Sequence, residues 1–333
     1  MADVTTYPTD APAPAAVTLR GAAIASLGAA VPARVVTNEE IGERLGVDDA
    51  WIMKRFGVRT RHYAAPDERL ADLAAAAGRQ ALERAGVAAE DLDMVLVGTF
   101  TSDEMMPHTS PHVAAALGAH RAGAIDVGAA CASWVSALVM GAGMIEAGRS
   151  ETMLVVGCDL LSRRLDHEDK KTAPLMADGA GAVVLRATDG PARVGPSVFH
   201  HDAEFWRSTY MARDDQVLRM EGPETYQVAV DAMTSTTTEL LEREGLTIDD
   251  IDLFVYHQGN ARILNAVGLR LGLKAERVAH YIEEFGNASA ATVPLALEAC
   301  KRDGRLRPGM KVFLASIGGG YSWGACVVTW GDA

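Results

Sequence analysis

Cys131 stands in a stretch of sequence that could present a nucleophile. The segment DVGAACASWVSAL places this cysteine between a run of small residues and an apolar run that is compatible with a helix. A cysteine at a strand-to-helix turn could be a nucleophile, because the start of a helix lowers the pKa of a thiol. It could also be one more small buried hydrophobe, since free cysteine is among the most buried residue types.

Two other stretches supply polar groups that could assist a thiol. VYHQGN puts His257 directly after an apolar run typical of a strand, and GNASAATVP puts Asn287 in a Gly-Asn turn that opens a small-residue helix. Both residues also have a purely structural explanation. His257 could be a buried histidine whose hydrogen bonds are satisfied within the fold, and Asn287 could be a turn residue or a helix N-cap. The segment ASIGGGYSWGA holds three successive glycines between two further strand-like runs. These glycines could let backbone N–H groups approach a ligand closely, or they could simply form the turn of a hairpin.

A repeat in the sequence indicates which elements position these residues. ALERAGVAAEDLDMVLVG (81–98) and LLEREGLTIDDIDLFVYH (240–257) align without a gap, and each reads as a helix end, a Gly stop, an acidic turn and a strand. Three more pairs follow in the same order: LGAHRAG with LGLKAER, GRSETMLVVG with GRLRPGMKVFLA, and GAGAVVL with WGACVVTW. A duplicated α/β unit is the simplest account. Because ligands gather at the carboxyl ends of strands, the two halves are predicted to share one cleft.

Composition excludes several other classes of protein. The 333 residues are 49% hydrophobic and 23% charged, which is ordinary for a globular protein, and no apolar run reaches the ~18 residues of a membrane span. The net charge of −13 argues against nucleic-acid binding.

Residues 1–17 are rich in Ala, Pro and Thr and are predicted to form a disordered tail rather than a signal peptide. Four scattered cysteines without CxxC spacing predict neither disulfides nor a zinc site, and favour a reducing cytoplasm.

Together, these stretches resemble the ketoacyl-[acyl carrier protein] synthase III family of the thiolase superfamily. ACASW, HQGN, GNASAATVP and GGGYSWGA stand in the family's order and spacing, and DDAWIMKRFGVRTRHYA and ADGAGAVVL match it as well. The resemblance runs from about residue 17 to the C-terminus. It implies an α/β, thiolase-like fold of two similar halves, residues 18–190 and 191–333, in a five-layer αβαβα arrangement. It also implies a homodimer.

The resemblance implies roles for the polar residues as well. Cys131 would be the acyl-accepting nucleophile, and its backbone N–H would form the oxyanion hole together with that of Gly319. His257 and Asn287 would hydrogen-bond the carbonyl oxygen of a malonyl thioester, on which decarboxylation builds negative charge. No metal or redox cofactor is required by this chemistry.

Binding residues for coenzyme A or phosphopantetheine follow from the same resemblance. Trp51 would stack on the adenine and Arg55 would meet the phosphates, while Lys170 falls where an arginine commonly assists the adenine. The alternative is that Trp51 is a packing residue and Arg55 a surface charge.

A carrier protein would dock on the basic stretch ARILNAVGLRLGLKAER. Arg262, Arg270 and Lys274 would receive this acidic partner, with Arg277 close by, whereas Gln227 replaces a basic docking residue of the family. The alternative is that this stretch is simply a solvated helix face.

Some residues depart from the family pattern. CASW replaces the usual CAGF, so that Ser133 and Trp134 change the packing behind the nucleophile. Met106 stands where the family has an aromatic gate that reaches the partner's acyl pocket. Trp134 and Met106 are therefore predicted to shape an acyl pocket that differs from the family's or is roomier. HHDAEFWRSTYMARDD, residues 200–215, shows little resemblance to the family.

These observations favour an acyltransferase that works through an acyl-enzyme. It would load an acyl group from acyl-CoA or acyl carrier protein on Cys131 and condense it with malonyl-carrier protein, by a decarboxylative Claisen reaction, to a β-ketoacyl thioester in fatty acid or polyketide biosynthesis. The alternative is transfer without decarboxylation, to another carrier protein, a hydroxyl or an amine. A non-catalytic partner subunit would lack the cysteine. A thiolase would need a second reactive cysteine, whereas Cys326 lies on a predicted strand.

Overall fold

Two β-sheets form the frame of the molecule. The computed structural model describes residues 20–331, so the tail predicted for residues 1–17 lies outside it. The first sheet has the strand order β1 (Gly21–Ala30), β7 (Asp178–Thr188), β6 (Thr152–Leu160), β4 (Met94–Gly98) and β5 (Gly123–Val127). The second sheet has the order β8 (Arg193–His201), β13 (Ser322–Thr329), β12 (Lys311–Gly318) and β11 (Leu253–Tyr256).

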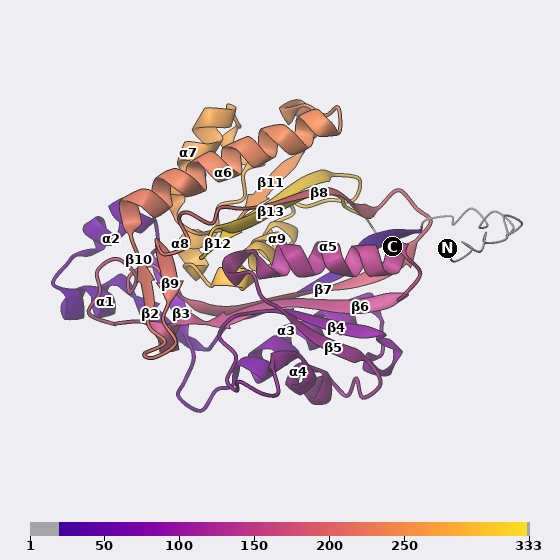
Figure 1. Ribbon diagram of the computed structural model, residues 1–333, viewed down its shortest axis with the longest axis horizontal. Helices are drawn as coiled ribbons and strands as arrows, with labels where there is room; N and C mark the ends of the chain where they lie inside the picture. Colours follow the sequence, from indigo (N-terminus) through magenta and orange to yellow (C-terminus); the bar gives the residue numbers. More distant parts are fainter. Residues whose placement is uncertain (1–19, 332–333) are drawn as a thin grey trace, which may run out of the picture.

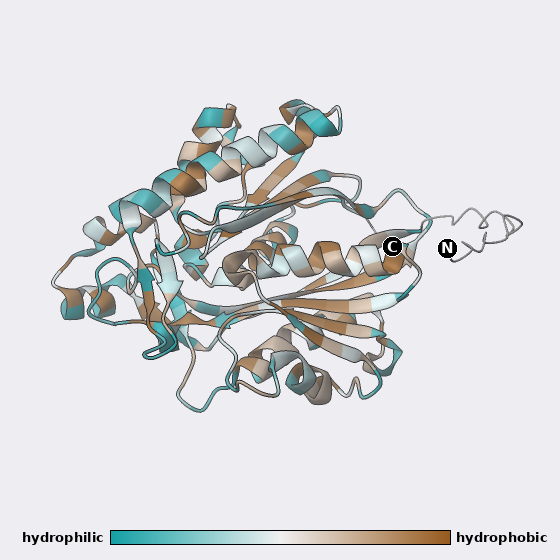
Figure 2. Cartoon of the chain, viewed as in Figure 1, coloured by the Kyte–Doolittle hydropathy of each residue, from teal (hydrophilic) through white to brown (hydrophobic). Residues whose placement is uncertain are grey.

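Helices cover both sheets and fill the space between them. The outer face of the first sheet carries α3 (Leu70–Ala85) and α4 (Thr109–Leu117), and that of the second carries α6 (Gly222–Arg243) and α7 (Ala261–Leu271). The middle layer consists of α5 (Ser133–Glu146) and α9 (Thr292–Arg302) (Figure 1). Hydrophobic residues gather in the strands and in α5, as expected for layers that are covered on both sides (Figure 2). The predicted αβαβα arrangement is confirmed.

The sheet topology shows the same repeat that the sequence predicts. In both sheets the first two neighbouring pairs are antiparallel and the third, β6–β4 or β12–β11, is parallel. Among residues 20–331, a single parallel bridge between Phe254 and Val278 stands in the second sheet where the first sheet has β5. Glycines in the left-handed conformation end the matching helices α4 and α7, as the paired LG motifs suggest.

Short elements outside the repeat gather at one end of the molecule (Figure 1). They are α1 (Asn38–Leu45), α2 (Asp49–Phe56), α8 (Ile282–Phe285), the antiparallel strand pair β2 (Arg34–Thr37) and β3 (Thr60–Tyr63), and the hairpin of β9 (Thr209–Met211) and β10 (Leu218–Met220). In α2 the Asp48 side chain accepts a hydrogen bond from the Trp51 N–H at 2.7 Å, and Gly57 ends the helix in a left-handed conformation. These caps fix the helix that carries Trp51 and Arg55.

Candidate active site

Cys131 lies in a tight turn between β5 and α5. A 3₁₀ turn, Ala130–Ala132, leads into the helix, and Ala130 has a φ of 46°, which L side chains rarely adopt. The second half packs directly against this turn at Gly318. A Cβ added at Gly318 would lie 2.8 Å from the Cys131 nitrogen and 2.4 Å from the Ala129 oxygen. The absence of a side chain at Gly318 therefore allows the two halves to meet at this turn.

The thiol of Cys131 is surrounded by donors and lies partly buried in the wall of a cavity. The hydroxyl of Ser289 donates to Sγ at 3.4 Å. Burial raises the pKa of Cys131 to about 11, and the negative charge of Asp159 acts in the same direction. The Ser289 hydroxyl and the backbone N–H groups of Gly319 and Cys131 act in the opposite direction. The expectation that the helix start lowers this pKa is wrong for the free protein, because desolvation outweighs the donors. The two N–H groups are those predicted for the oxyanion hole, and that role stays a prediction.

His257 follows β11 and is fixed at its backbone and its ring. Its N–H donates to the Ala315 oxygen at 2.7 Å, and Nδ1 lies 2.7 Å from the hydroxyl of Thr292. That hydroxyl donates its one hydrogen to the Ser289 oxygen at 2.9 Å. The network therefore assigns the ring proton to Nδ1 and leaves a lone pair on Nε2. Burial lowers the pKa of His257 to about 4, so that the ring is neutral near pH 7.

The side-chain amide of Asn287 has a defined orientation. Its Oδ1 accepts a hydrogen bond from the Ser289 N–H at 2.9 Å, and its Nδ2 lies 3.4 Å from the Gly259 oxygen. Because a backbone donor occupies the oxygen, the nitrogen is the end of the amide that is free to donate further. Asn287 can therefore act as a hydrogen-bond donor in the site.

One cavity of about 550 Å³ brings most of the predicted site residues together. It is lined by Cys131, His257, Asn287, Gly319, Trp51, Arg55, Lys170 and Arg262, among others. The sequence did not indicate that the β9–β10 hairpin closes one side of this cavity through Thr209 and Met220, because residues 200–215 carry no recognisable motif. Tyr226 and Tyr321 also line it, and only the position of Tyr321 directly after the triple glycine could have signalled this.

The residues predicted to bind coenzyme A carry positive charge into this cavity. The guanidinium of Arg55 lies 4.4 Å from the ring centroid of Trp51, so one face of that indole is occupied and a stacked adenine would use the other. Lys170 and Lys171 line the same cavity, and Lys171 pairs with Glu221 at 3.1 Å. On a chain with a net charge of −13, these side chains form a local concentration of positive charge, and their binding of coenzyme A stays a prediction.

The predicted docking residues differ in how free they are. Arg262 lines the cavity and lies 5.2 Å from the ring centroid of Tyr226. Arg270 is already paired with Asp231, which also accepts a hydrogen bond from Gln227 at 2.8 Å. Lys274 precedes a short 3₁₀ turn. Only Arg262 of the three predicted docking cations reaches the cavity.

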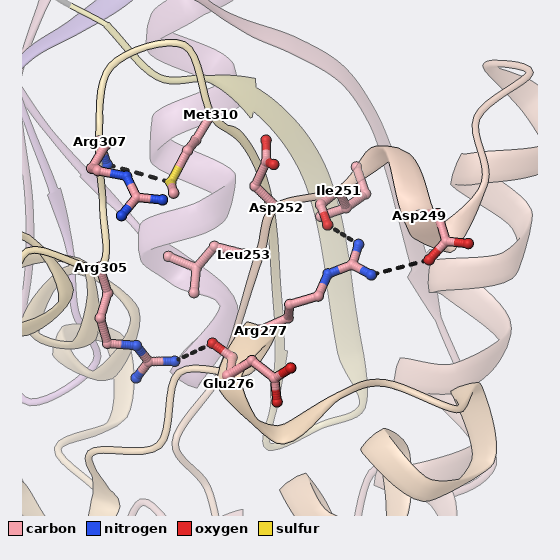
Figure 3. A pocket seen from close by; sticks show the side chains of 9 residues that line it. All are labelled: Asp249, Ile251, Asp252, Leu253, Glu276, Arg277, Arg305, Arg307 and Met310. Carbon is pink, nitrogen blue, oxygen red and sulfur yellow. Dashed lines mark hydrogen bonds and ion pairs between the residues drawn. The ribbon is translucent and has the colours of Figure 1, made fainter.

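Arg277, at the end of the same basic stretch, has a structural role. It donates to the carbonyl oxygens of Ile248 and Ile251 and pairs with Asp249 at 3.2 Å. Figure 3 shows it in a surface hollow with Arg305, which donates to the Glu276 oxygen at 3.0 Å. The hollow contains none of the predicted catalytic residues.

The two residues predicted to line the acyl pocket are not in the cavity. Trp134 is completely buried in the core around α5, beneath the turn of Cys131. Met106 lies in a loop with 87% of its surface exposed, and its predicted contact with a partner's pocket needs a second copy. Ser133, the other departure in CASW, closes the turn by donating to the Ala130 oxygen at 2.6 Å.

Comparisons with known proteins agree with this geometry. Models of 3-oxoacyl-[acyl-carrier-protein] synthase III and of its C-terminal part match residues 125–203 and 241–330. A β-ketoacyl-[acyl-carrier-protein] synthase III of Symbiobacterium thermophilum is 38% identical over 327 residues, which cover 94% of this chain and 99% of that protein. The chain belongs to the β-ketoacyl-[acyl-carrier-protein] synthase III family. Its members are condensing acyltransferases, and the resemblance predicted from the motifs is confirmed.

Solved structures of this synthase III family extend the comparison to the fold. The 3-oxoacyl-(acyl carrier protein) synthase III of Pseudomonas aeruginosa PAO1 is similar with a TM-score of 0.90 and 38% identity, covering 94% of this chain and 99% of that one. The priming β-ketosynthase of the R1128 polyketide pathway is similar with a TM-score of 0.91 and 34% identity, covering 96% and 99%. The thiolase-like fold is thereby confirmed. Within residues 20–331, no helix has the length and apolar character needed to cross a membrane.

Proposed function

We propose that this member of the synthase III family transfers an acyl group from acyl-CoA or acyl carrier protein to Cys131 and condenses it with malonyl-carrier protein. The observation that carries the proposal is the convergence of Cys131, His257 and Asn287 in one cavity with a cationic lining. A thiol, an imidazole and an amide donor are the groups that acyl transfer and decarboxylation use.

The first step exchanges one thioester for another. Sγ of Cys131 attacks the acyl carbonyl carbon, and the bond from that carbon to the pantetheine sulfur breaks. Since burial keeps the thiol protonated, its proton must leave as the bond forms. Nε2 of His257 carries the free lone pair, receives this proton and returns it to the departing pantetheine thiolate. The backbone N–H groups of Cys131 and Gly319 stabilise the tetrahedral oxyanion.

The second step forms a carbon–carbon bond. The bond between the malonyl α-carbon and its carboxylate breaks, carbon dioxide leaves, and the electron pair moves into an enolate. Asn287 donates through Nδ2 to the enolate oxygen. His257 donates to the same oxygen through Nε2 after that nitrogen takes up a proton from solvent, while Nδ1–H keeps its contact with the Thr292 hydroxyl. The enolate carbon then attacks the acyl carbon on Cys131, and the thiolate that leaves takes the proton from Nε2.

A second copy of the chain is part of the proposal. Strand β5 pairs only with β4, so its other edge has no partner within residues 20–331. Ile125 on this strand and Met105 and Met106 in the nearby loop are 49%, 80% and 87% exposed. Exposed apolar side chains beside an open strand edge favour pairing with another strand. A homodimer through β5 would cover them. The four free cysteines fit a reducing cytoplasm.

An intact-mass experiment in two steps tests the proposal. The protein is incubated with a panel of acyl thioesters of coenzyme A and of carrier protein, with Cys131→Ala as the control, and the added acyl mass is measured. Malonyl-carrier protein is then added and the carrier is weighed. A β-ketoacyl carrier, lighter by carbon dioxide than the sum of its parts, is the expected product. An acyl-enzyme that ignores malonyl-carrier protein but loads a hydroxyl, an amine or another carrier would overturn decarboxylative condensation.

A further inference from the structure

Ser289 occupies the position in the second half that Ala130 occupies in the first. Each residue begins a 3₁₀ turn, Ser289–Ala291 or Ala130–Ala132, that leads into a helix of the middle layer. Their φ angles are 52° and 46°, both in the left-handed region. The two turns therefore have the same unusual backbone, and at the matched position one carries a methyl group and the other a hydroxyl.

The hydroxyl of Ser289 faces the sulfur on which the proposed chemistry depends. It donates to Sγ of Cys131 at 3.4 Å, across the contact between the two halves. Ser289 has no exposed surface, whereas Cys131 is partly buried and lines the cavity. A hydrogen bond to a charged acceptor is stronger than one to a neutral acceptor, and the sulfur is the atom that becomes charged.

Neighbouring residues hold Ser289 in this orientation. Its N–H donates to Oδ1 of Asn287 at 2.9 Å, and the next N–H, that of Ala290, donates to Oδ2 of Asp159 at 3.3 Å. Asp159 is itself buried and accepts the hydroxyls of Thr99 and Thr101 at 2.8 Å each. Hydrogen bonds to the N–H groups of Ser289 and Ala290 thus hold the turn, and they keep the backbone of Ser289 in its left-handed conformation.

We propose that Ser289 is a further catalytic residue, whose hydroxyl donates to the sulfur of Cys131 while that sulfur carries negative charge. It stabilises the thiolate when Cys131 attacks the acyl donor and again when the thiolate leaves in the condensation step. Ser289 keeps its own proton throughout, and the thiol proton goes to His257. Asp159 is a positioning residue for this serine. The inference rests on the proposed role of Cys131.

Alkylation of Cys131 by iodoacetamide tests the contact without any acyl substrate. The rate is measured against pH, by mass spectrometry of the peptide that contains Cys131, for the wild type, Ser289→Ala and Ser289→Gly. Ala130 shows that an alanine adopts the same φ in this fold, so Ser289→Ala keeps the backbone. Below the pKa of the thiol, both variants should react roughly 10- to 100-fold more slowly, with the rate profile moved to higher pH by about one to two units.

Ser316→Ala is the matched control, because that serine donates to the backbone oxygen of Cys131 at 2.7 Å and not to its sulfur. Its profile should stay within about threefold of the wild type. An alkylation rate of Ser289→Ala equal to that of the wild type would overturn the inference. A large difference in rate between Ser289→Ala and Ser289→Gly would overturn it as well, because backbone strain rather than the hydroxyl would then determine the reactivity of Cys131. If the alkylation profile shifts as expected but no acyl thioester acylates the wild-type protein, the proposed function is refuted, whereas the hydrogen bond from Ser289 to the sulfur is still supported.

Discussion

Nδ1 of His257 lies 2.7 Å from the hydroxyl oxygen of Thr292, the first residue of α9. The hydroxyl also donates to the Ser289 oxygen at 2.9 Å, and Ser133, the first residue of α5, makes the corresponding bond to the Ala130 oxygen at 2.6 Å. The repeat thus places a hydroxyl at the start of both central helices. In the second half this hydroxyl also selects which ring nitrogen of His257 carries the proton.

Thr292→Val should impair catalysis by leaving Nδ1 of His257 without a partner. Valine has nearly the shape of threonine, so the change removes the hydrogen bond and little else. We expect acylation of Cys131 in a single turnover, measured by quenched-flow mass spectrometry, to slow roughly tenfold, and the free energy of unfolding to fall by about 1–3 kcal/mol. Thr292→Ser, which keeps the hydroxyl, should remain near the wild type. Equal rates for the Val and Ser variants would show that the contact does not orient the ring.

The buried histidine should make the stability of the fold depend on pH. The pKa of His257 is lowered from 6.5 to about 4 by burial, so between these values the unfolded chain binds more protons than the folded one. The contribution of the neutral His257 ring to the free energy of unfolding is fully present above about pH 6.5. It is lost as the pH falls toward 4, and the loss is at most about 3 kcal/mol. Urea unfolding across this range should show a steeper loss of stability for the wild type than for His257→Asn. Identical pH slopes would contradict the assigned neutral ring.

Gly318→Ala should disrupt the turn of Cys131. The added Cβ would lie 2.4 Å from the Ala129 oxygen and 2.8 Å from the Cys131 nitrogen, and both are backbone atoms that cannot move aside alone. We expect acylation to fall at least 100-fold and stability to fall by about 1–3 kcal/mol. Gly143→Ala in α5 is the control, because a Cβ there meets nothing within 4 Å and should leave both quantities unchanged or slightly improved. Thermal melting and acyl loading measure the two effects, and normal loading of Gly318→Ala would refute the tight contact.

Arg262 and Arg270 should contribute unequally to carrier-protein binding. Arg262 lines the cavity, whereas Arg270 is already paired with Asp231. Arg262→Ala is expected to raise KM for malonyl-carrier protein roughly tenfold with kcat little changed, and to weaken the dependence of KM on salt. Arg270→Ala should change KM by less than about threefold. Steady-state kinetics at two salt concentrations measure both effects. A larger increase of KM for Arg270→Ala than for Arg262→Ala would contradict the prediction and would indicate that the carrier protein docks nearer to Arg270 on α7.

The sequence was sufficient to predict the layers and three polar residues that line one cavity, Cys131, His257 and Asn287, but not the turns that hold them. The repeat could be recognised because glycine stops and apolar strand runs recur in order, and it placed His257 opposite Gly98. The match between the turns at Ala130 and Ser289 was missed, because alanine and serine give no signal for a left-handed backbone. The high pKa of Cys131 was missed as well, since it arises from burial between two halves that are far apart in the chain.

Within the matched turns and strand ends of the repeat, each candidate catalytic side chain stands opposite a glycine or an alanine of the other half. Gly98 stands opposite His257, and by the register of the two turns Gly128 stands opposite Asn287. The candidate catalytic groups thus come from different halves, Cys131 from the first and His257 and Asn287 from the second. The space opposite His257 is closed, because a Cβ at Gly98 would lie 2.8 Å from the carbonyl carbon of Ser133 and 2.8 Å from the nitrogen of Trp134. Both are backbone atoms at the start of α5, so a side chain at position 98 would have to displace the helix that follows Cys131.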